Sequence, residues 1–228
     1  FLGRQKVYFT LGQDEVLDKI LMKSFNAVRA GQRRGGVVPS EIQALEPLVH
    51  EMRLIKSKYE ISLMKKSAKI SVDAHKRIFE NCKPGVFEYQ IEADIIHEFG
   101  KHGAVPAYTS IVASGQNACT LHYISNRDKM KSGQLLLTDA GCENEMYAAD
   151  ITRTIPVSGE YSKEQKEIYE LVLEVQKNAI NSIKPGQTFE GLQSDAIKGL
   201  TKGLKKLGLL KGRVDQLIKS EAYKDFCL

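Results

Sequence analysis

The sequence predicts an α+β fold in which antiparallel strands are flanked by helices. Two long helical patterns, each opened by a capping motif and closed by Lys-Pro-Gly, enclose a region rich in β-forming residues. With 228 residues, of which 42% are apolar and 27% charged, the chain has the composition of a globular protein. Its length allows one large domain or two small ones.

The first fifty residues have a pattern of their own. A strand-like run at 6–10 precedes an amphipathic helix, and the stretch 31–36 then breaks the pattern as a loop or linker edge. The apolar side of that helix consists of Val16, Ile20, Leu21 and Phe25. A short apolar segment follows and ends near Val49. Because the chain begins inside the strand-like run, we expect it to be a fragment that enters a domain in its middle.

Two helices are expected before the strands. Ser57 and Glu60 form a capping box, in which each side chain accepts a backbone N–H at the start of a helix. This helix should end near Asn81, before Lys-Pro-Gly. A second helix at 88–102 should end at Gly103, because a left-handed residue closes many helices.

Strands and further helices follow. Residues 104–156 are rich in Val, Ile, Thr and Tyr, with Ser-Gly and Ser-Asn turn signals, which predicts several short strands. A second capping box, formed by Ser162 and Gln165, opens a long helix that should run to about Ile183. A last helix should begin near Phe189.

The two helical regions match each other in sequence order. Each has a capped helix, Lys-Pro-Gly, and a Phe-Glu pair that leads into a second helix. The pairs are Phe87-Glu88 and Phe189-Glu190, about a hundred residues apart, which favours an internal duplication. In that case the second copy has its helices but lacks most of the strands that follow them in the first.

Two aspartates, Asp139 and Asp150, lie among the apolar residues of the predicted strands. A hairpin that turns at Asn144-Glu145 would place them directly opposite each other, with Cβ atoms about 4.5–5.5 Å apart. Carboxylates at that distance repel unless one is protonated or a cation lies between them, and hard divalent ions prefer carboxylate oxygens. In the alternative, the register is shifted and both carboxylates face water. A metal site would need further ligands from elsewhere.

Three segments resemble one enzyme family: "HEMRLIKSKYEI" (50–61), "NACTLHY" (117–123) and "LLTDAGCENEMYAADITRTIPVSG" (136–159). They are similar to aminopeptidase P, the Xaa-Pro aminopeptidases, which are pita-bread metallopeptidases. The resemblance implies a pita-bread (creatinase/aminopeptidase-like) fold, of which this chain forms the first part only. It also implies that residues 1–50 are the C-terminal remnant of the N-terminal, creatinase-like domain, and that 51–228 are the N-terminal part of the catalytic domain.

The resemblance implies roles for four residues. Asp139 would bind one metal ion in a bidentate manner, and Asp150 would bridge two divalent ions, usually Mn²⁺ with Co²⁺ or Zn²⁺ as substitutes. His122 would be a catalytic residue that also binds substrate near the scissile bond, and Tyr108 would belong to the same substrate-binding network. A water shared by the ions would release the N-terminal residue of peptides that have proline second. The intact protein would be a cytoplasmic homo-oligomer.

The family completes its metal site with one histidine and two glutamates from the second half of the fold. All histidines of this chain precede Asp150; they are His50, His75, His97, His102 and His122. The chain is therefore expected to hold about half of the ligands and to be truncated at both ends. Three alternatives stay open: a prolidase, a non-catalytic pita-bread module that binds peptides or proteins, and an inactive fragment.

Several other features are interpreted as structural. The histidines of "HEFGKH" (97–102) are five positions apart, so they cannot both face one ion from a helix. The lysines of "KGLTKGLKKLGLLKGR" (198–213) lie outside an apolar stripe, which is typical of a surface helix. That stripe consists of Ile197, Leu200, Leu204 and Leu207. Strand parity turns Cys142 and Arg153 away from Asp139 and Asp150, respectively.

Charge and cysteine content narrow the expected partners. No apolar run approaches the roughly 20 residues that span a bilayer, and the net charge of +5 is spread along the chain. We therefore expect neither a membrane nor a nucleic-acid partner. The four cysteines stand far apart, which favours reduced thiols in a cytosolic protein. They are Cys82, Cys119, Cys142 and Cys227.

Overall fold

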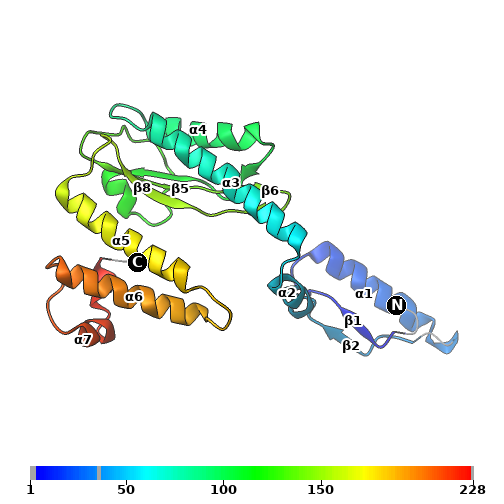
Figure 1. Ribbon diagram of the computed structural model, residues 1–228. Coiled ribbons are helices and arrows are strands. Elements are labelled where there is room, and N and C mark those ends of the chain that lie inside the picture. Colours follow the sequence, from blue (N-terminus) through cyan, green and yellow to red (C-terminus); the bar gives the residue numbers. More distant parts are fainter. Residues whose placement is uncertain (1–3, 35–36, 227–228) are drawn as a thin grey trace. The chain divides into compact units, whose positions relative to one another are not determined.

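The computed structural model describes residues 4–34 and 37–226, whose helices and strands are drawn in Figure 1. The chain forms two compact units, Phe1–Ser62 and Leu63–Leu228. The predicted division into domains after residue 50 stays a prediction. The described cysteines Cys82, Cys119 and Cys142 are free thiols, whereas Cys227 lies outside the described residues.

The first unit combines a two-stranded parallel sheet with short helices. Its elements are β1 (Lys6–Tyr8), α1 (Glu15–Ala30), η1 (Gln32–Arg34), β2 (Glu41–Gln43) and α2 (Glu46–Leu54). The predicted strand and first helix are therefore present. The strand β2 and the helix α2 were not predicted, because three residues carry little periodicity and α2 has no side-chain cap at Leu45.

The apolar side of α1 is only partly buried. Leu21 and Phe25 are buried, whereas Val16 and Ile20 are 65% and 53% exposed. The start of the helix is set by Asp14, whose Oδ1 accepts the N–H of Val16 at 2.8 Å.

The two helices expected before the strands are α3 (Lys58–Asn81) and α4 (Glu88–Lys101). At the start of α3, the Ser57 N–H donates to Glu60 Oε2 at 2.6 Å and the Glu60 N–H donates to Ser57 Oγ at 3.3 Å. These two bonds confirm the capping box. Gly103, just after α4, has the expected left-handed backbone with a φ of 68°.

Short antiparallel strands follow, as predicted. One sheet has the order β4-β5-β8, with strands Ile111–Ser114, Leu135–Asp139 and Thr152–Pro156. A second has the order β3-β6-β7, with strands Val105–Pro106, Cys142–Asn144 and Tyr147–Ala148. Between β4 and β5 the chain forms the 3₁₀ helix η2 (Gly115–Cys119) and a loop.

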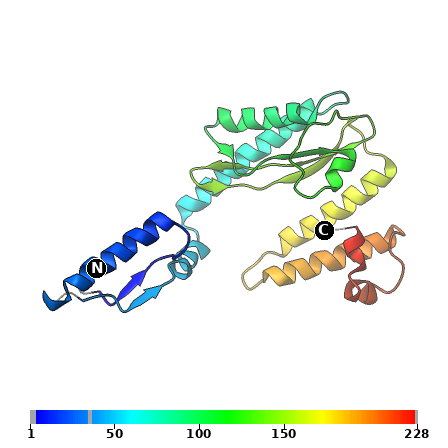
Figure 2. The ribbon, with the colours of Figure 1, turned by 180° about the vertical axis from the view of Figure 1, so that it is seen from behind.

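The main core lies between the helices α3 and α4 and one face of the β4-β5-β8 sheet (Figures 1 and 2). Its fully buried members include Ile78, Ile91, Ile95, Phe99, Val112 and Leu136. Burial of each such side chain contributes about 1.5–3 kcal/mol, so this cluster fixes the sheet against the helices. Successive strand residues alternate between faces, and Asp139 therefore points away from this core while Thr138 faces it.

The C-terminal part is helical. It consists of α5 (Lys163–Ser182), α6 (Phe189–Lys206), α7 (Val214–Lys219) and η3 (Ala222–Asp225). The predicted capping box of α5 is confirmed by reciprocal bonds of 3.2 and 2.9 Å between Ser162 and Gln165. The order of helix, Lys-Pro-Gly turn and helix repeats that of α3 and α4, with φ values of 93° at Gly85 and 89° at Gly186. Within the described residues, no strand follows α6.

The lysine-rich helix α6 behaves as predicted. Its apolar stripe is buried or half-buried, and Leu204 packs with Leu210 and Leu217 in a small second core. The lysines at 198, 202, 205 and 206 are exposed. This arrangement is that of a surface helix with one face on the protein.

Candidate active site

Tyr108, Asp139 and Asp150 meet at one end of the β4-β5-β8 sheet. The Tyr108 hydroxyl lies 2.6 Å from Asp139 Oδ1 and 3.1 Å from Asp150 Oδ1. Tyr108 precedes β4, Asp139 ends β5 and Asp150 precedes β8. Because neighbouring strands are antiparallel, these three points lie at the same end of the sheet. A phenol has a single proton, so it donates to one carboxylate at a time while it approaches the other.

The register differs from the predicted one. Asp139 pairs with Thr152 and not with Asp150, so the register is shifted, as in the alternative, and the two aspartates do not lie directly opposite each other. Asp139 is half-buried and Asp150 is exposed. The hairpin turns at Glu145-Met146, one residue later than predicted, with φ values of 51° and 67°. Asp150 therefore lies on the diagonal to Asp139, which keeps the two side chains within reach of one hydroxyl.

A close backbone contact shapes the segment between the aspartates. A Cβ atom at Gly141 would overlap the carbonyl oxygen of Ala149, so only glycine fits there. The Ala149 N–H donates to the Cys142 carbonyl at 2.9 Å, and the Ala140 N–H donates to the Ile151 carbonyl at 3.1 Å. Backbone hydrogen bonds within the hairpin thus hold its two arms together where they pass from one sheet to the other.

Three polar side chains of α3 hold the same hairpin from the core side. Ser67 Oγ donates to the Tyr147 carbonyl at 2.6 Å, and Ser71 Oγ accepts the Cys142 N–H at 3.0 Å. His75 Nε2 donates to the Ala140 carbonyl at 3.2 Å. Sequence reasoning missed these residues, although their spacing of four along an otherwise apolar helix face is a readable signal.

The electrostatics of the site keep Tyr108 neutral. Burial raises the pKa of its hydroxyl, and the hydrogen bond to Asp139 and the charges of both aspartates raise it further. Tyr108 is therefore a permanent proton donor to the carboxylate pair. For the neighbouring His75, burial lowers the pKa even though its backbone hydrogen bonds oppose this shift, so the imidazole is neutral.

His122 is the predicted site residue that the structure leaves apart from the other three. It lies in the loop between η2 and β5, is exposed, and has a left-handed backbone with a φ of 53°. No hydrogen bond connects its side chain to any residue that the structure describes. The structure thus brings together Tyr108, Asp139 and Asp150, and places His122 apart from them on the loop between η2 and β5.

The carboxylate pair fits part of a metal-ligand set. Carboxylate oxygens that converge on one point are the ligands that hard divalent ions prefer. Within residues 4–34 and 37–226, no group of three or more His, Cys, Asp or Glu side chains is arranged to hold a metal ion. Asp139 and Asp150 therefore supply two oxygen-donor side chains, and a complete site requires further donors.

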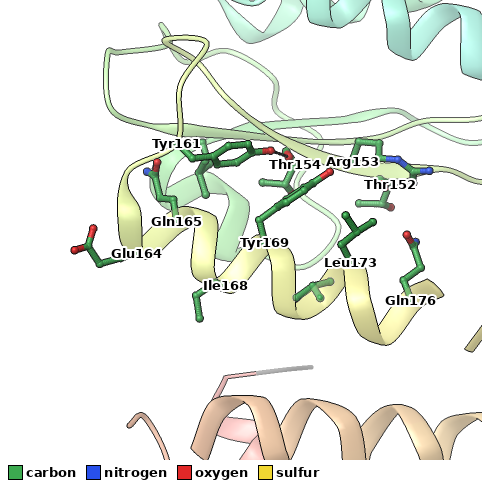
Figure 3. Close-up of a pocket in the computed structure, with 12 residues that line it drawn as sticks. Thr152, Arg153, Thr154, Tyr161, Glu164, Gln165, Ile168, Tyr169, Leu173 and Gln176 are labelled. Atoms are coloured by element: carbon green, nitrogen blue, oxygen red, sulfur yellow. Dashed lines mark hydrogen bonds between the residues drawn. The ribbon is translucent and has the colours of Figure 1, made fainter. Parts of the chain in front are cut away.

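A pocket of about 600 Å³ lies next to this site, between β8 and α5 (Figure 3). Its walls include Thr152, the cross-strand partner of Asp139, together with Tyr161 and Tyr169. None of the four predicted site residues lines the pocket. The pocket is therefore not the candidate site itself, although it opens beside the same strand.

The features interpreted as structural behave accordingly. His97 is exposed, and His102 lies at the end of α4 with its Nε2 3.1 Å from Glu98. Cys142 is buried, and its thiol donates to the Ser67 carbonyl. Arg153 donates to the carbonyl of its neighbour Thr152.

No helix in the described part of the chain is both long enough and apolar enough to span a bilayer.

Comparison with known proteins gives a consistent result. The model of metallopeptidase family M24 matches residues 62–224. The chain is 42% identical to the Xaa-Pro aminopeptidase of Escherichia coli K12 over 98% of its length and 51% of that protein. It is 50% identical to the Xaa-Pro aminopeptidase of Haemophilus influenzae over 82% of its length and 44% of that protein. The chain thus spans about half the length of these curated relatives.

Solved structures agree with the sequence comparison. Aminopeptidase PepP of Pseudomonas aeruginosa is 48% identical and superposes with a TM-score of 0.95, covering 98% of this chain and 51% of that structure. A variant of E. coli aminopeptidase P in complex with substrate is 42% identical, also with a TM-score of 0.95, covering 99% and 51%. The predicted α+β, pita-bread fold portion is confirmed. The chain belongs to metallopeptidase family M24.

Proposed function

We propose that this chain carries part of the active site of a metal-dependent Xaa-Pro aminopeptidase, which releases the N-terminal residue from peptides with proline second. The observation that carries the proposal is the convergence of Asp139 and Asp150 on the Tyr108 hydroxyl. This convergence occurs in a chain of which 98% aligns with an Xaa-Pro aminopeptidase at 42% identity. A carboxylate pair of this kind is favourable where a cation balances its charge.

Asp139 and Asp150 are the residues of this chain that would hold the metal ions. We propose two divalent ions, Mn²⁺ with Co²⁺ or Zn²⁺ as substitutes, and one related structure is a zinc-substituted E. coli aminopeptidase P in complex with product. When bound, such ions lower the pKa of water and polarise a peptide carbonyl. The remaining donors would come from outside this pair.

The other site residues would position and bind. Tyr108, kept neutral by its surroundings, lies within hydrogen-bond distance of both carboxylates and orients the one to which its hydroxyl donates. His122 is exposed on its loop and is free to contact the peptide near the scissile bond. We further propose that the intact protein is a cytoplasmic homo-oligomer, as the family resemblance implies.

The proposal is tested by peptide hydrolysis with the purified intact protein loaded with Mn²⁺. The expected substrate is a tripeptide with proline second, and the matched peptide with alanine second should be a poor substrate. Asp150→Asn should lower kcat/KM at least about 100-fold, because even partners of metal ligands contribute about 10–100-fold. Asp195→Asn is the control, since Asp195 lies exposed on α6 with Lys198 at 3.7 Å.

Three results would separate the alternatives. Equal hydrolysis by the wild-type and Asp150→Asn proteins, or hydrolysis that survives a chelator, would contradict a metal-dependent peptidase. Cleavage of an Xaa-Pro dipeptide but not of the longer peptide would favour a prolidase. Binding of the peptide without release of an amino acid would favour a non-catalytic module.

A further inference from the structure

Glu88 is a buried carboxylate that the proposed mechanism does not use. It is the first residue of α4 and is 0% exposed. Its Oε1 accepts the Ser114 N–H at 2.7 Å, the Ser114 hydroxyl at 2.8 Å and Asn117 Nδ2 at 3.0 Å. Its Oε2 accepts the Tyr123 hydroxyl at 2.8 Å and the Asp128 N–H at 2.9 Å. Five donors thus surround one side chain.

These donors keep Glu88 ionised inside the protein. Burial alone would raise the pKa of this carboxyl, but the hydrogen bonds from Asn117, Asp128 and Ser114 outweigh burial and lower it. A buried charge costs several kcal/mol of desolvation unless such bonds compensate for it. The network is therefore complete only when every donor is in place.

The donors belong to one segment. All of them come from residues 114–128, the end of β4 and the loop that carries His122. Asn117 and Tyr123 lie on either side of His122 in sequence. A second anchor, Asn126, is 1% exposed and bonds the Val112 N–H at 3.0 Å and the Ser110 carbonyl at 2.9 Å.

The backbone of the loop needs this support. His122 and Asn126 have φ values of 53° and 50°, in the left-handed region. Non-glycine residues there cost on the order of 1 kcal/mol each and persist where the surrounding structure fixes them. Two buried side chains support the loop backbone: Glu88 from α4 and Asn126 from the loop itself.

The second copy of the repeat begins its helix, α6, without a buried glutamate. Glu190 occupies the matching position after the second Lys-Pro-Gly turn, at the start of α6. It is exposed and accepts no hydrogen bond from a side chain in the described part of the chain. The burial of Glu88 is thus specific to the copy that carries the His122 loop.

We infer that Glu88 is a positioning residue, which fixes the loop 114–128 and thereby the position of His122. The inference deepens the proposed function and rests on it for the role of His122. Glu88 is fully buried and does not itself contact substrate. Its effect on the reaction passes through the loop.

The test replaces Glu88 by glutamine in the full chain. Glu88→Gln keeps the shape but turns one acceptor oxygen into an NH₂ group. If that oxygen is Oε2, the Asp128 N–H loses its acceptor, and if it is Oε1, Asn117 and the Ser114 N–H lose theirs. Amide hydrogen exchange of residues 115–128 should rise about tenfold, the factor expected for loss of one hydrogen bond to a charged group. Glu190→Gln is the matched control and should leave exchange unchanged.

The ring signals of the histidines in NMR spectra separate positioning from general destabilisation. The His122 signal, assigned by its loss in His122→Ala, should move to the position of a histidine in an unfolded peptide. The His75 signal should stay in place, because His75 is buried on α3 and bonds the Ala140 carbonyl, outside the loop 114–128. An unchanged His122 signal in Glu88→Gln would overturn the inference, as would equal shifts of His75 and His122.

Two additions keep the test decisive. If Glu88→Gln does not fold, Tyr123→Phe removes one donor without neutralising the buried charge and should move the same His122 signal by a smaller amount. Where the protein hydrolyses Xaa-Pro peptides, Glu88→Gln should lower kcat/KM about tenfold in the wild-type background and not further in His122→Ala. An equal loss in both backgrounds would overturn the inference. The NMR result stands by itself, whether or not hydrolysis is found.

Discussion

At the scale of single residues, the site depends on one hydroxyl shared by two carboxylates. Tyr108 was expected only from the family resemblance, because a tyrosine that lies 31 positions before Asp139 gives no local signal. The antiparallel order of β4, β5 and β8 places the residues flanking these strands together, and that is a long-range property. Asp139 and Asp150, by contrast, stood out in the sequence because they interrupt apolar strand patterns.

Tyr108→Phe tests the importance of this hydroxyl for the fold. Loss of a hydrogen bond to a charged group should lower the free energy of unfolding by about 1.5–3 kcal/mol, measured by urea denaturation at neutral pH. Tyr89→Phe is the control, because Tyr89 is 47% exposed and its ring stacks on Phe87. Equal unfolding free energies for the two variants would contradict the contacts of Tyr108.

Glu88 gives a pH-dependent prediction. Its folded-state pKa lies below the ordinary value of 4.5, so its stabilising contribution is present above pH 4.5 and is lost as the pH falls through the folded pKa. The difference in unfolding free energy between the wild-type and Glu88→Gln proteins should therefore shrink as the pH falls below 4.5. Urea denaturation at neutral and acidic pH measures it. A difference that stays constant or grows would contradict an ionised Glu88.

At the scale of elements, the strands and the hairpin could be predicted, but the register could not. Glu145 and Met146 both have positive φ, as a two-residue hairpin turn requires, yet neither is the Asn or Gly that normally announces such a turn. The predicted turn was therefore displaced by one residue. The capping boxes at Ser57 and Ser162 were predictable, because the capping residues and the helix lie within one turn of each other.

The polar stripe on α3, formed by Ser67, Ser71 and His75, should stabilise the hairpin between Asp139 and Asp150. Ser71→Ala leaves the buried Cys142 N–H without its partner, which should lower the unfolding free energy by about 1–3 kcal/mol. Ser62→Ala on the exposed side of the same helix shares any gain in helix propensity and should change stability by less than about 0.5 kcal/mol. Thermal and urea denaturation of the pair give the comparison, and similar values would show that the stripe contributes nothing.

At the scale of the whole molecule, the repeated helix pairs were visible in the sequence because each copy keeps its capping box and Lys-Pro-Gly turn. The short helix α7 and the strand β2 could not be predicted from the sequence, because their six and three residues show too little hydrophobic periodicity. Much of the predicted face of α1 proved exposed, since burial depends on neighbours that a helical pattern does not specify.

The two units should differ in local stability. In the described part of the first unit, the buried apolar side chains are Leu21 and Phe25, whereas the second unit contains the large core around Ile95 and Phe99. Amide exchange should therefore be faster in α1 than in α4, because local opening is easier where fewer apolar groups are buried. Equal protection of the two helices would contradict this picture.

The central claim is that Asp139 and Asp150 bind divalent metal ions. The most direct measurement is the broadening of backbone amide NMR signals on addition of small amounts of Mn²⁺, because it locates even a weak site. We predict that the signals of Asp139, Asp150 and Tyr108 broaden first. If they broaden no earlier than those of Glu164 and Glu167, which are exposed acidic residues at the start of α5, the claim is contradicted.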